Sequence, residues 1–451
     1  MIRPLVKEIP FCKPLDVFSK VSQQPGAVLL ESADEEGYSF IGVDPFECLQ
    51  LKNEDPFVTL EQQLKAYTLQ SLPGYPPFQG GIMGFFAYDL IQYLEVWPKP
   101  PLDDMQFPDI SVGFYDVVIA FDHAKQKSFI FSSGLSHRVA PDRLAHAQSR
   151  IAWVLTLLQQ PAVVPSAIKK MISGEIQSNF TQENYCQAVR EVKDYILAGD
   201  IFEANISQRF QACLTENATP FDLYLKLRQI NPAPFSAFIS HPGVSLVSAS
   251  PERFIKKEGG KVEVRPIKGT RPRSKNLIED EKLAETLLHS EKDRAENIMI
   301  VDLMRNDLSK VCLPDSVIVE KLCGLESFTH VHHLVSVITG ELRAQTTVID
   351  LLKAVFPGGS ITGAPKLRAM EIISEIEPTA RGPYCGGLGY IGFDGAMDLA
   401  MTIRTFCIKD KTVTFQAGGA IVLDSEPGQE YQETLDKVQS LKKVLYGACD
   451  R

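Results

Sequence analysis

The sequence predicts an α+β protein in which helices pack on the outside of mainly antiparallel β-sheets. Two patterns predict this class. Short apolar runs separated by turn residues such as P-G and G-G are typical of strands, and they fill much of residues 1–155. After Thr181 the apolar spacing changes to the helical period, and further groups of strands follow. Strands and helices grouped in this way favour antiparallel sheets with helices outside them.

The length of the chain predicts two domains or two intertwined halves, because 451 residues exceed the size at which one core usually keeps growing. We expect an N-terminal α+β domain at residues 1–165, intertwined with a second part at residues 180–446. The expected linker is Gln159–Ser178, where Pro161, Pro165 and Gly174 interrupt regular structure.

The expected elements follow the chain in order. The first part should contain four strands and then a helix, at residues 27–32, 38–43, 80–89, 110–122 and 142–158. The second part should begin with a helix that ends at Gly199. Its remaining strands are expected at residues 206–214, 235–239, 244–248, 261–270 and 331–342, with three more within 386–422. Its remaining helices are expected within 279–308 and at 348–356, 366–377 and 429–445.

Composition and charge exclude several classes of protein. The net charge of −10 and the pI near 5.4 argue against a nucleic-acid or anionic-membrane partner, because both are held mainly by a basic face. No apolar run is long enough to span a membrane. The nine cysteines are scattered without a C-x-x-C pair, and no secretory h-region is apparent at the start. We therefore expect a reduced, cytoplasmic protein.

Lys268 is the first candidate for chemistry. It ends the stretch K-V-E-V-R-P-I-K-G-T, whose period-2 pattern places Lys268 on the face shared by Val262 and Val264. An ammonium group removed from water loses solvation, so its pKa should fall and a nucleophilic amine should become available. The alternative is a lysine that reaches solvent or pairs with a carboxylate.

Two helices carry carboxylates at i, i+3 spacing. Glu430 and Glu433 share one face with Lys437, and Asp293 and Glu296 repeat the spacing on another helix. Two such pairs could hold Mg²⁺, which takes oxygen ligands and is usually fixed by one or two carboxylates. The alternative is two solvated helix faces with intrahelical ion pairs.

A glycine-rich turn invites comparison with a P-loop. Gly358 and Gly363 stand at the right spacing, but the lysine of the turn, Lys366, is displaced by two positions, which argues against a nucleotide site. Free amides at the following helix start, with the hydroxyls of Ser360 and Thr362, could instead bind an anion. A purely structural turn is the alternative.

Four motifs in one order resemble the chorismate-binding enzymes, a family that includes anthranilate, aminodeoxychorismate, isochorismate and salicylate synthases. The motifs are S-A-S-P-E-R-F (248–254), K-D-R-A-E-N-I-M-I-V-D-L-M-R-N-D (292–307), F-P-G-G-S-I-T-G-A-P-K (356–366) and A-G-G-A-I-V (417–422). The resemblance covers roughly residues 180–446. It implies two facing sheets with helices on their outer faces, and chorismate as the substrate.

The resemblance also implies roles for single residues. Glu296 and Glu433 match direct Mg²⁺ ligands, and Asp293 and Glu430 match the water-mediated shell. Glu252 matches a general acid, since a buried carboxyl group near the leaving hydroxyl could donate a proton; pairing with a neighbouring arginine is the alternative. The expected substrate contacts are Ser360, Thr362, His333, Tyr384, Arg404, Lys437 and a turn at Gly418 and Gly419.

Within the family, P-I-K-G-T around Lys268 resembles the aminodeoxychorismate synthases, whereas anthranilate synthases usually carry alanine there. Glu203 stands where the isochorismate and salicylate synthases have a water-activating lysine. That difference argues against water addition, but ammonia-using members commonly have glutamine there, so the role of Glu203 stays open. The implied reaction is Mg²⁺-dependent amination of chorismate at carbon 4 through a covalent Lys268 intermediate. Alternatives are an anthranilate synthase or a non-catalytic tryptophan-binding homologue.

Two further expectations concern ammonia and tryptophan. No cysteine lies in a G-x-C-x-G turn, so we expect a separate glutamine amidotransferase subunit to supply ammonia. In the family, L-L-E-S and N-P-S-P-Y segments close over a feedback inhibitor, and this chain has L-L-E-S ending at Ser32 and N-P-A-P-F from Asn231 to Phe235. The expected tryptophan pocket contains Ser32, Asn231, Pro232 and Phe235. The alternative is that these segments only join the two halves.

Overall fold

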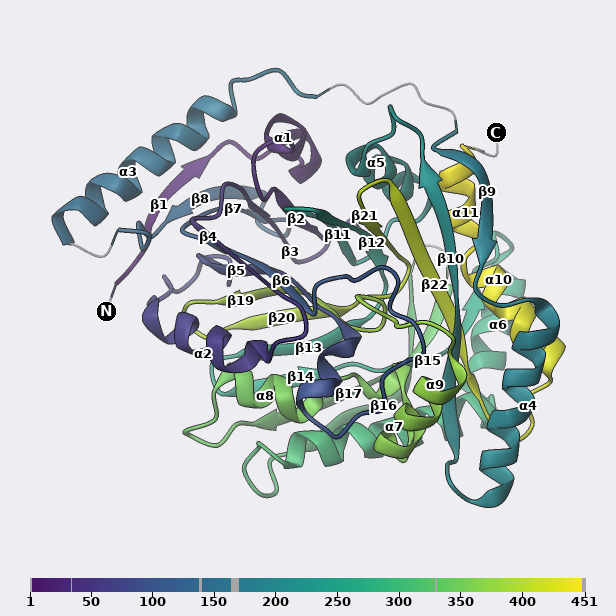
Figure 1. Ribbon diagram of the computed structural model, residues 1–451. Helices are drawn as coiled ribbons and strands as arrows, with labels where there is room; N and C mark the ends of the chain where they lie inside the picture. Colours follow the sequence, from purple (N-terminus) through teal and green to yellow (C-terminus); the bar gives the residue numbers. More distant parts are fainter. Residues whose placement is uncertain (1, 34, 138–139, 164–169, 329–330, 448–451) are drawn as a thin grey trace.

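The computed structural model describes residues 2–33, 35–137, 140–163, 170–328 and 331–447, and these form two antiparallel sheets that face each other (Figure 1). The larger sheet has 12 strands. In spatial order these are β1 (Leu5–Ile9), β8 (Lys127–Ser132), β7 (Val117–Asp122), β3 (Tyr38–Gly42), β2 (Val28–Glu31), β11 (Phe235–His241), β12 (Val244–Ser250), β21 (Thr405–Lys409), β22 (Thr412–Ile421), β10 (Glu203–Leu214) and β18 (Gly363–Ala364), with β9 (Ile172–Ser178) also on β10.

The smaller sheet has 10 strands. In spatial order these are β15 (Ile267–Pro272), β17 (Val331–Glu341), β14 (Lys261–Val264), β13 (Arg253–Glu258), β20 (Met397–Met401), β19 (Gly387–Gly392), β5 (Gly81–Phe86), β6 (Ile110–Tyr115) and β4 (Glu47–Leu51), with β16 (Ile318–Ser327) also on β17. Residues 1–165 and 180–446 both contribute strands to both sheets. The division into two domains at these bounds stays a prediction.

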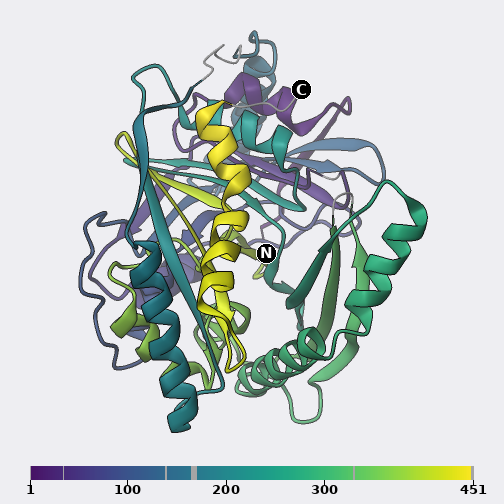
Figure 2. The ribbon, with the colours of Figure 1, turned by 90° about the vertical axis from the view of Figure 1, so that its right-hand side faces the viewer.

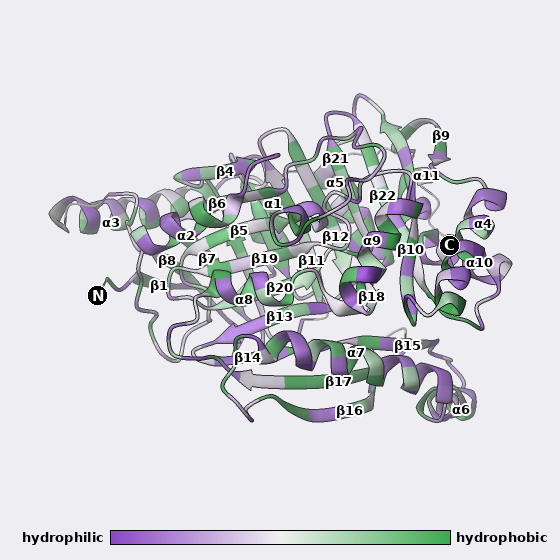
Figure 3. Ribbon diagram, turned by 60° about the horizontal axis from the view of Figure 1, so that its bottom comes forward, coloured by the Kyte–Doolittle hydropathy of each residue, from purple (hydrophilic) through white to green (hydrophobic). Residues whose placement is uncertain are grey.

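Helices cover the outer faces of the sheets. They are α1 (Pro14–Val21), α2 (Pro56–Ala66), α3 (Ala140–Leu157), α4 (Gln182–Ala198), α5 (Pro220–Ile230), α6 (Leu277–Leu288), α7 (Glu291–Ser309), α8 (Val348–Val355), α9 (Lys366–Ile376), α10 (Pro427–Lys437) and α11 (Gln439–Tyr446), with short 3₁₀ turns η1 (Tyr88–Tyr93) and η2 (Gly359–Ile361). In the described ranges, no helix has the length and apolar character needed to cross a membrane. Figure 3 shows mostly hydrophobic central strands and a largely hydrophilic α10.

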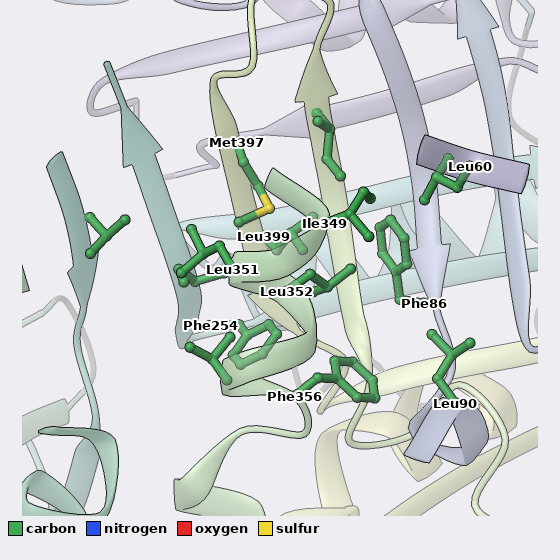
Figure 4. Close-up of a cluster of buried hydrophobic side chains, with 14 of the residues drawn as sticks. Leu60, Phe86, Leu90, Phe254, Ile349, Leu351, Leu352, Phe356, Met397 and Leu399 are labelled. Carbon is green, nitrogen blue, oxygen red and sulfur yellow. The ribbon is translucent and has the colours of Figure 1, made fainter. Parts of the chain in front are cut away.

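Three buried layers hold the architecture together. Phe40 of the larger sheet and Phe85 and Tyr390 of the smaller sheet belong to one cluster between the sheets. A second cluster packs α2, α7 and α8 on the outer face of the smaller sheet; in Figure 4, Leu352 of α8 lies among Phe254, Leu399 and other apolar side chains. A third cluster packs α1, α5 and α11 on the larger sheet. Facing sheets with outer helices, as predicted from the family resemblance, are confirmed.

The structure corrects five predicted elements. Residues 110–122, expected as one strand, are β6 and β7, which lie in different sheets, and the three strands expected within 386–422 are four, β19 to β22. The stretch Lys261–Thr270 is two strands, β14 and β15, because Pro266 interrupts pairing with β17. Part of the expected linker is strand β9, which pairs with β10; residues 164–169 of that linker lie outside the described residues. The expected helix 429–445 is α10 and α11, which meet at Val438. The helix ending at Gly199 is confirmed, with Gly199 in the left-handed region at φ 85°.

Leu352→Ala should lower the free energy of unfolding by about 2–5 kcal/mol, because it leaves a cavity in a closely packed cluster. Urea denaturation followed by circular dichroism measures the loss. Leu144→Ala on α3 is the control, since Leu144 is 50% exposed and removes little buried area. Equal losses in the two variants would contradict the packing described here.

Candidate active site

Lys268 joins the two sheets and a helix in a buried ion-pair cluster. Its Nζ lies 3.1 Å from Glu203 Oε1 on β10 of the larger sheet and 2.5 Å from Glu296 Oε1 on α7. Lys268 itself is on β15 of the smaller sheet and is 8% exposed. The period-2 pattern therefore predicted correctly that Lys268 points inward.

The predicted direction of the Lys268 pKa is wrong for this arrangement. Burial by itself lowers the pKa, but the adjacent carboxylates of Glu203 and Glu296 outweigh it and raise the Lys268 pKa well above its usual value. The alternative, a lysine paired with carboxylates, is what the structure contains. Burial raises the pKa of Glu203, and its Oε2 has no hydrogen-bond partner among the described residues. Lys268 must therefore lose a proton and leave Glu296 before it can act as a nucleophile.

Glu252 lies close to this cluster, just after β12. It is 6% exposed, and burial raises its pKa to about 7, although a hydrogen bond from Ser360 and the charge of Lys268 both lower it. The Ser360 hydroxyl donates to Glu252 Oε1 at 2.7 Å. A carboxyl group with this pKa can hold a proton at neutral pH, as a general acid must. The alternative of a Glu252 ion pair with a neighbouring arginine is not found among the described contacts.

The glycine-rich turn forms η2 and β18 and faces inward. The Thr362 hydroxyl donates to the carbonyl oxygens of Gly358 and Gly359 at 3.2 Å, so it is engaged within the turn. The Lys366 side chain is 10% exposed, and its Nζ contacts Asp307 and the backbone of residues 355 and 357. Among the predicted donors of this turn, the Ser360 hydroxyl therefore contacts Glu252 and the Thr362 hydroxyl is not free for a ligand.

The four predicted metal-binding carboxylates each have their own partner. Asp293 pairs with Arg271 at 2.9 Å, and Glu433 pairs with Lys437 at 2.6 Å. Glu430 accepts a hydrogen bond from Ser425 at 2.6 Å, while Glu296 holds Lys268. Within the described part of the chain, no three His, Cys, Asp or Glu residues are grouped closely enough to hold a metal ion. Carboxylate oxygens suit Mg²⁺ chemically, but this arrangement does not assemble them around one point.

Gly418 and Gly419 lie within strand β22, so the predicted turn at these residues is wrong. They pair with Ser207 and Ile206 of β10, and a Cβ on Gly418 would lie 2.4 Å from the Ile206 carbonyl oxygen. A Cβ on Gly419 would lie 3.1 Å from Glu430 Oε2. Lys437 donates to the Gly418 carbonyl at 2.8 Å. Close backbone approach therefore requires glycine at Gly418, whereas Gly419 leaves room for the Glu430 carboxylate.

The other predicted substrate contacts lie around the same region. Tyr384 is buried, and the Arg404 guanidinium donates to the Lys437 carbonyl. Burial lowers the pKa of His333 to about 4, so its imidazole is neutral, and His333 Nδ1 lies 2.8 Å from Thr270 Oγ1. In Figure 2, the lower yellow helix, α10, lies beside α4 (dark teal), and α6 and α7 (green) lie on its other side.

Sequence reasoning missed two charged residues beside the site. Glu377 and Arg381 form a buried ion pair at 2.7 Å that contacts β10 and the η2 turn. The signal was present: the two residues are spaced i, i+4, and Arg381 precedes Tyr384 by three positions.

The segments of the expected tryptophan pocket are brought together. Strand β2, which carries L-L-E, pairs with β11, and Ala33 donates to the Ala233 carbonyl at 3.2 Å. Ser32 is buried, and Asn231 and Pro232 precede β11. The Arg253 guanidinium lies 5.1 Å from the Phe235 ring centroid. This pairing joins the two halves of the chain whether or not a ligand binds.

Comparison with known proteins identifies the family of this chain. The model of the chorismate binding enzyme family matches residues 26–443. This chain belongs to that family. It is 36% identical to aminodeoxychorismate synthase component 1 of Bacillus subtilis, with 98% of this chain and 97% of that protein covered. It is also 40% identical to anthranilate synthase component 1 of Thermus thermophilus, with 96% and 95% covered.

Solved structures agree with the family assignment. Anthranilate synthase component I from Streptococcus pneumoniae superimposes with a TM-score of 0.81 at 33% identity, covering 90% of this chain and 92% of that one. The isochorismate synthase MenF of Escherichia coli gives a TM-score of 0.76 at 17% identity, covering 99% and 95%, and this likeness shows the fold alone. Family membership makes the chain a chorismate-using enzyme, while the similarity to aminating members is divided between two reactions.

Proposed function

We propose that this chain catalyses the Mg²⁺-dependent amination of chorismate at ring carbon 4, giving 4-amino-4-deoxychorismate for 4-aminobenzoate and folate biosynthesis. The observation that carries the proposal is the buried Lys268 beside Glu203 and Glu296, with Glu252 nearby. A lysine that can pass its proton to an adjacent carboxylate, close to a protonated carboxyl group, is the combination that a covalent displacement needs. An anthranilate synthase, which aminates carbon 2 directly, has no use for this lysine.

The proposed reaction is a double displacement. Lys268 attacks carbon 2 of chorismate, the ring double bonds shift, and the 4-hydroxyl leaves as water with a proton from Glu252. Ammonia then bonds to carbon 4, the double bonds shift back, and the bond between carbon 2 and Lys268 breaks. Glu203, 3.1 Å from Lys268 Nζ, is the acceptor within reach for the proton that Lys268 must lose before it attacks. The enolpyruvyl group is retained, so a separate lyase is needed to form 4-aminobenzoate.

Ammonia is proposed to come from a glutamine amidotransferase subunit, which the name "component 1" of the relatives supports. Purified chain incubated with chorismate, Mg²⁺ and ammonium should give 4-amino-4-deoxychorismate by mass spectrometry, and glutamine in place of ammonium should give none. Fluorescent anthranilate as the main product would contradict the proposal and support the alternative reaction. Absence of any product would favour the non-catalytic tryptophan-binding homologue.

Lys268→Ala should reduce formation of the 4-amino product by about 10³-fold or more, because the covalent nucleophile is lost. Chorismate should still bind, and some ammonia should add at carbon 2 instead. Rates by liquid chromatography and binding by calorimetry measure the two effects. Lys261→Ala, which removes an exposed lysine from β14, is the control. An undiminished rate in Lys268→Ala would refute the covalent step.

Activity should fall as pH rises through about 7, because the Glu252 carboxyl group must be protonated and burial sets its pKa at about 7. The hydrogen bond from Ser360 stabilises the charged carboxylate and lowers this pKa. Ser360→Ala should therefore move the alkaline limb of kcat/KM to higher pH. Ser309→Ala, at an exposed serine of α7, should leave the limb in place. A limb that is the same in all three proteins would show that Glu252 is not the acid.

Mg²⁺ is proposed to bind Glu296 and Glu433, with Asp293 and Glu430 around it. The ion would supply Lewis-acid polarisation of the substrate when bound, and it would compete with Lys268 and Lys437 for their carboxylate partners. Glu296→Gln or Glu433→Gln should raise the half-saturating Mg²⁺ concentration about tenfold or more. Glu291→Gln on the exposed start of α7 is the control. Unchanged Mg²⁺ titration curves in both ligand variants would contradict the assignment.

Tryptophan is proposed to bind where β2 meets the Asn231–Phe235 segment. A ligand that binds only the folded chain raises the melting temperature as its concentration increases. Protein refolded without tryptophan should show that rise, and Phe235→Ser should lose it. The same melting temperature at all tryptophan concentrations, with no tryptophan released from the original preparation, would leave only the joining role.

A further inference from the structure

We propose that Glu377 and Arg381 act together as a positioning pair, which holds the Ser360 turn, Tyr384 and strand β10 in register around chorismate. The inference rests on the proposed use of these groups with chorismate. Neither residue is required to touch the substrate. Their effect would pass through the backbone groups that they bind.

The pair is a buried, two-point ion pair. Arg381 Nε donates to Glu377 Oε2 at 2.9 Å, and Arg381 Nη2 donates to Glu377 Oε1 at 2.7 Å. Both residues are 3% exposed. Such a planar fork fixes the direction of the guanidinium as well as its distance.

The remaining donors of Arg381 reach two separate parts of the site. Nη1 donates to the carbonyl of Ile361, between Ser360 and Thr362, at 3.2 Å. Nη2 donates to the carbonyl of Asn205, two residues after Glu203, at 2.7 Å. One guanidinium therefore sets the η2 turn, which carries the Glu252 hydrogen bond, against the strand that carries the partner of Lys268.

Glu377 extends the contact along β10. Its Oε1 accepts hydrogen bonds from the backbone N–H of Ser207 at 2.8 Å and from the Ser207 hydroxyl at 2.9 Å. Ser207 is paired with Gly418 of β22. The position of the β22 backbone beside Glu430 and Glu433 thus also depends on this carboxylate.

Two tyrosines flank the guanidinium. Its carbon lies 4.7 Å from the Tyr88 ring centroid and 5.8 Å from that of Tyr384. The next residue, Gly382, is held from the N-terminal part of the chain: its carbonyl accepts from the Tyr88 N–H at 2.8 Å, and its N–H donates to Asp89 at 3.0 Å. The loop that carries Tyr384 is therefore held by Arg381 and by the hydrogen bonds of Gly382 to Tyr88 and Asp89.

A purely stabilising role does not account for this arrangement. Buried ion pairs contribute little net stability compared with well-packed apolar residues of similar volume. Among the described residues, the side-chain hydrogen bonds that leave the pair end on β10 or on the η2 turn. A displacement of about 1 Å in catalytic groups can cost about 10²-fold in rate, so a rigid link between these elements has a direct kinetic consequence.

The test uses the full chain with Arg381→Lys, which keeps the charge but loses the fork, and Glu377→Gln, which keeps the shape but loses the charge. Both should lower kcat by about 10–10²-fold with a smaller change in KM. Because the Ser360 bond to Glu252 is loosened, the alkaline limb of the pH profile should also move to higher pH. Arg209→Lys is the matched control, since Arg209 is a buried arginine of β10 that also forms a two-point pair, with Asp104.

Rates are measured for whichever amino product the wild-type chain forms, so an error in the choice of ring carbon would leave this test intact. Folded variants with the kcat and the pH limb of Arg209→Lys would overturn the proposal. So would failure of both variants to fold, since the pair would then be a folding element alone. Loss of kcat in a folded variant, with a displaced limb, supports it.

Discussion

The ammonium group of Lys268 is the point at which the two sheets meet chemically. Its carboxylate partners come from β10 in the larger sheet and from α7 on the smaller one. Removing one partner of such a buried pair typically costs about 3–5 kcal/mol, because a charge remains without compensation. The relative placement of the sheets and the state of the proposed nucleophile therefore depend on the same contacts.

The local sequence pattern predicted much of this site. It missed the contacts between residues that lie far apart in the chain. The burial of Lys268 followed from alternation within ten residues. The direction of its pKa did not, because Glu203 is 65 residues away and no periodicity links the two. Likewise, Gly418 and Gly419 were expected in a turn, because only their pairing with β10 shows that they lie in a strand. The i, i+3 carboxylates on α7 and α10 were correctly placed on helices. Glu433 pairs with Lys437 of the same helix, as the alternative expected, whereas Asp293 pairs with Arg271 of β15 through a tertiary contact.

The similar proteins share one fold, whereas the choice of reaction depends on single residues. A protein that is 17% identical keeps the architecture at a TM-score of 0.76. Relatives bearing two different reaction names are both near 40% identical. Overall similarity therefore cannot choose between these reactions, and the choice depends on a few side chains inside a common frame. From the family resemblance, Lys268 is the side chain expected to separate the two reactions, whereas the role of Glu203 stays open.

The way both halves share both sheets also constrains how the chain is made. Strand β2 lies between β3 and β11, and β5 lies between β6 and β19, so each early strand has one neighbour that is synthesised much later. Until residues 235–241 and 387–392 have left the ribosome, these strands keep unpaired edges and apolar faces. Folding must close contacts across hundreds of residues, which is slow and exposes the nascent chain to aggregation. We therefore expect the N-terminal half expressed alone to require chaperones or to be degraded.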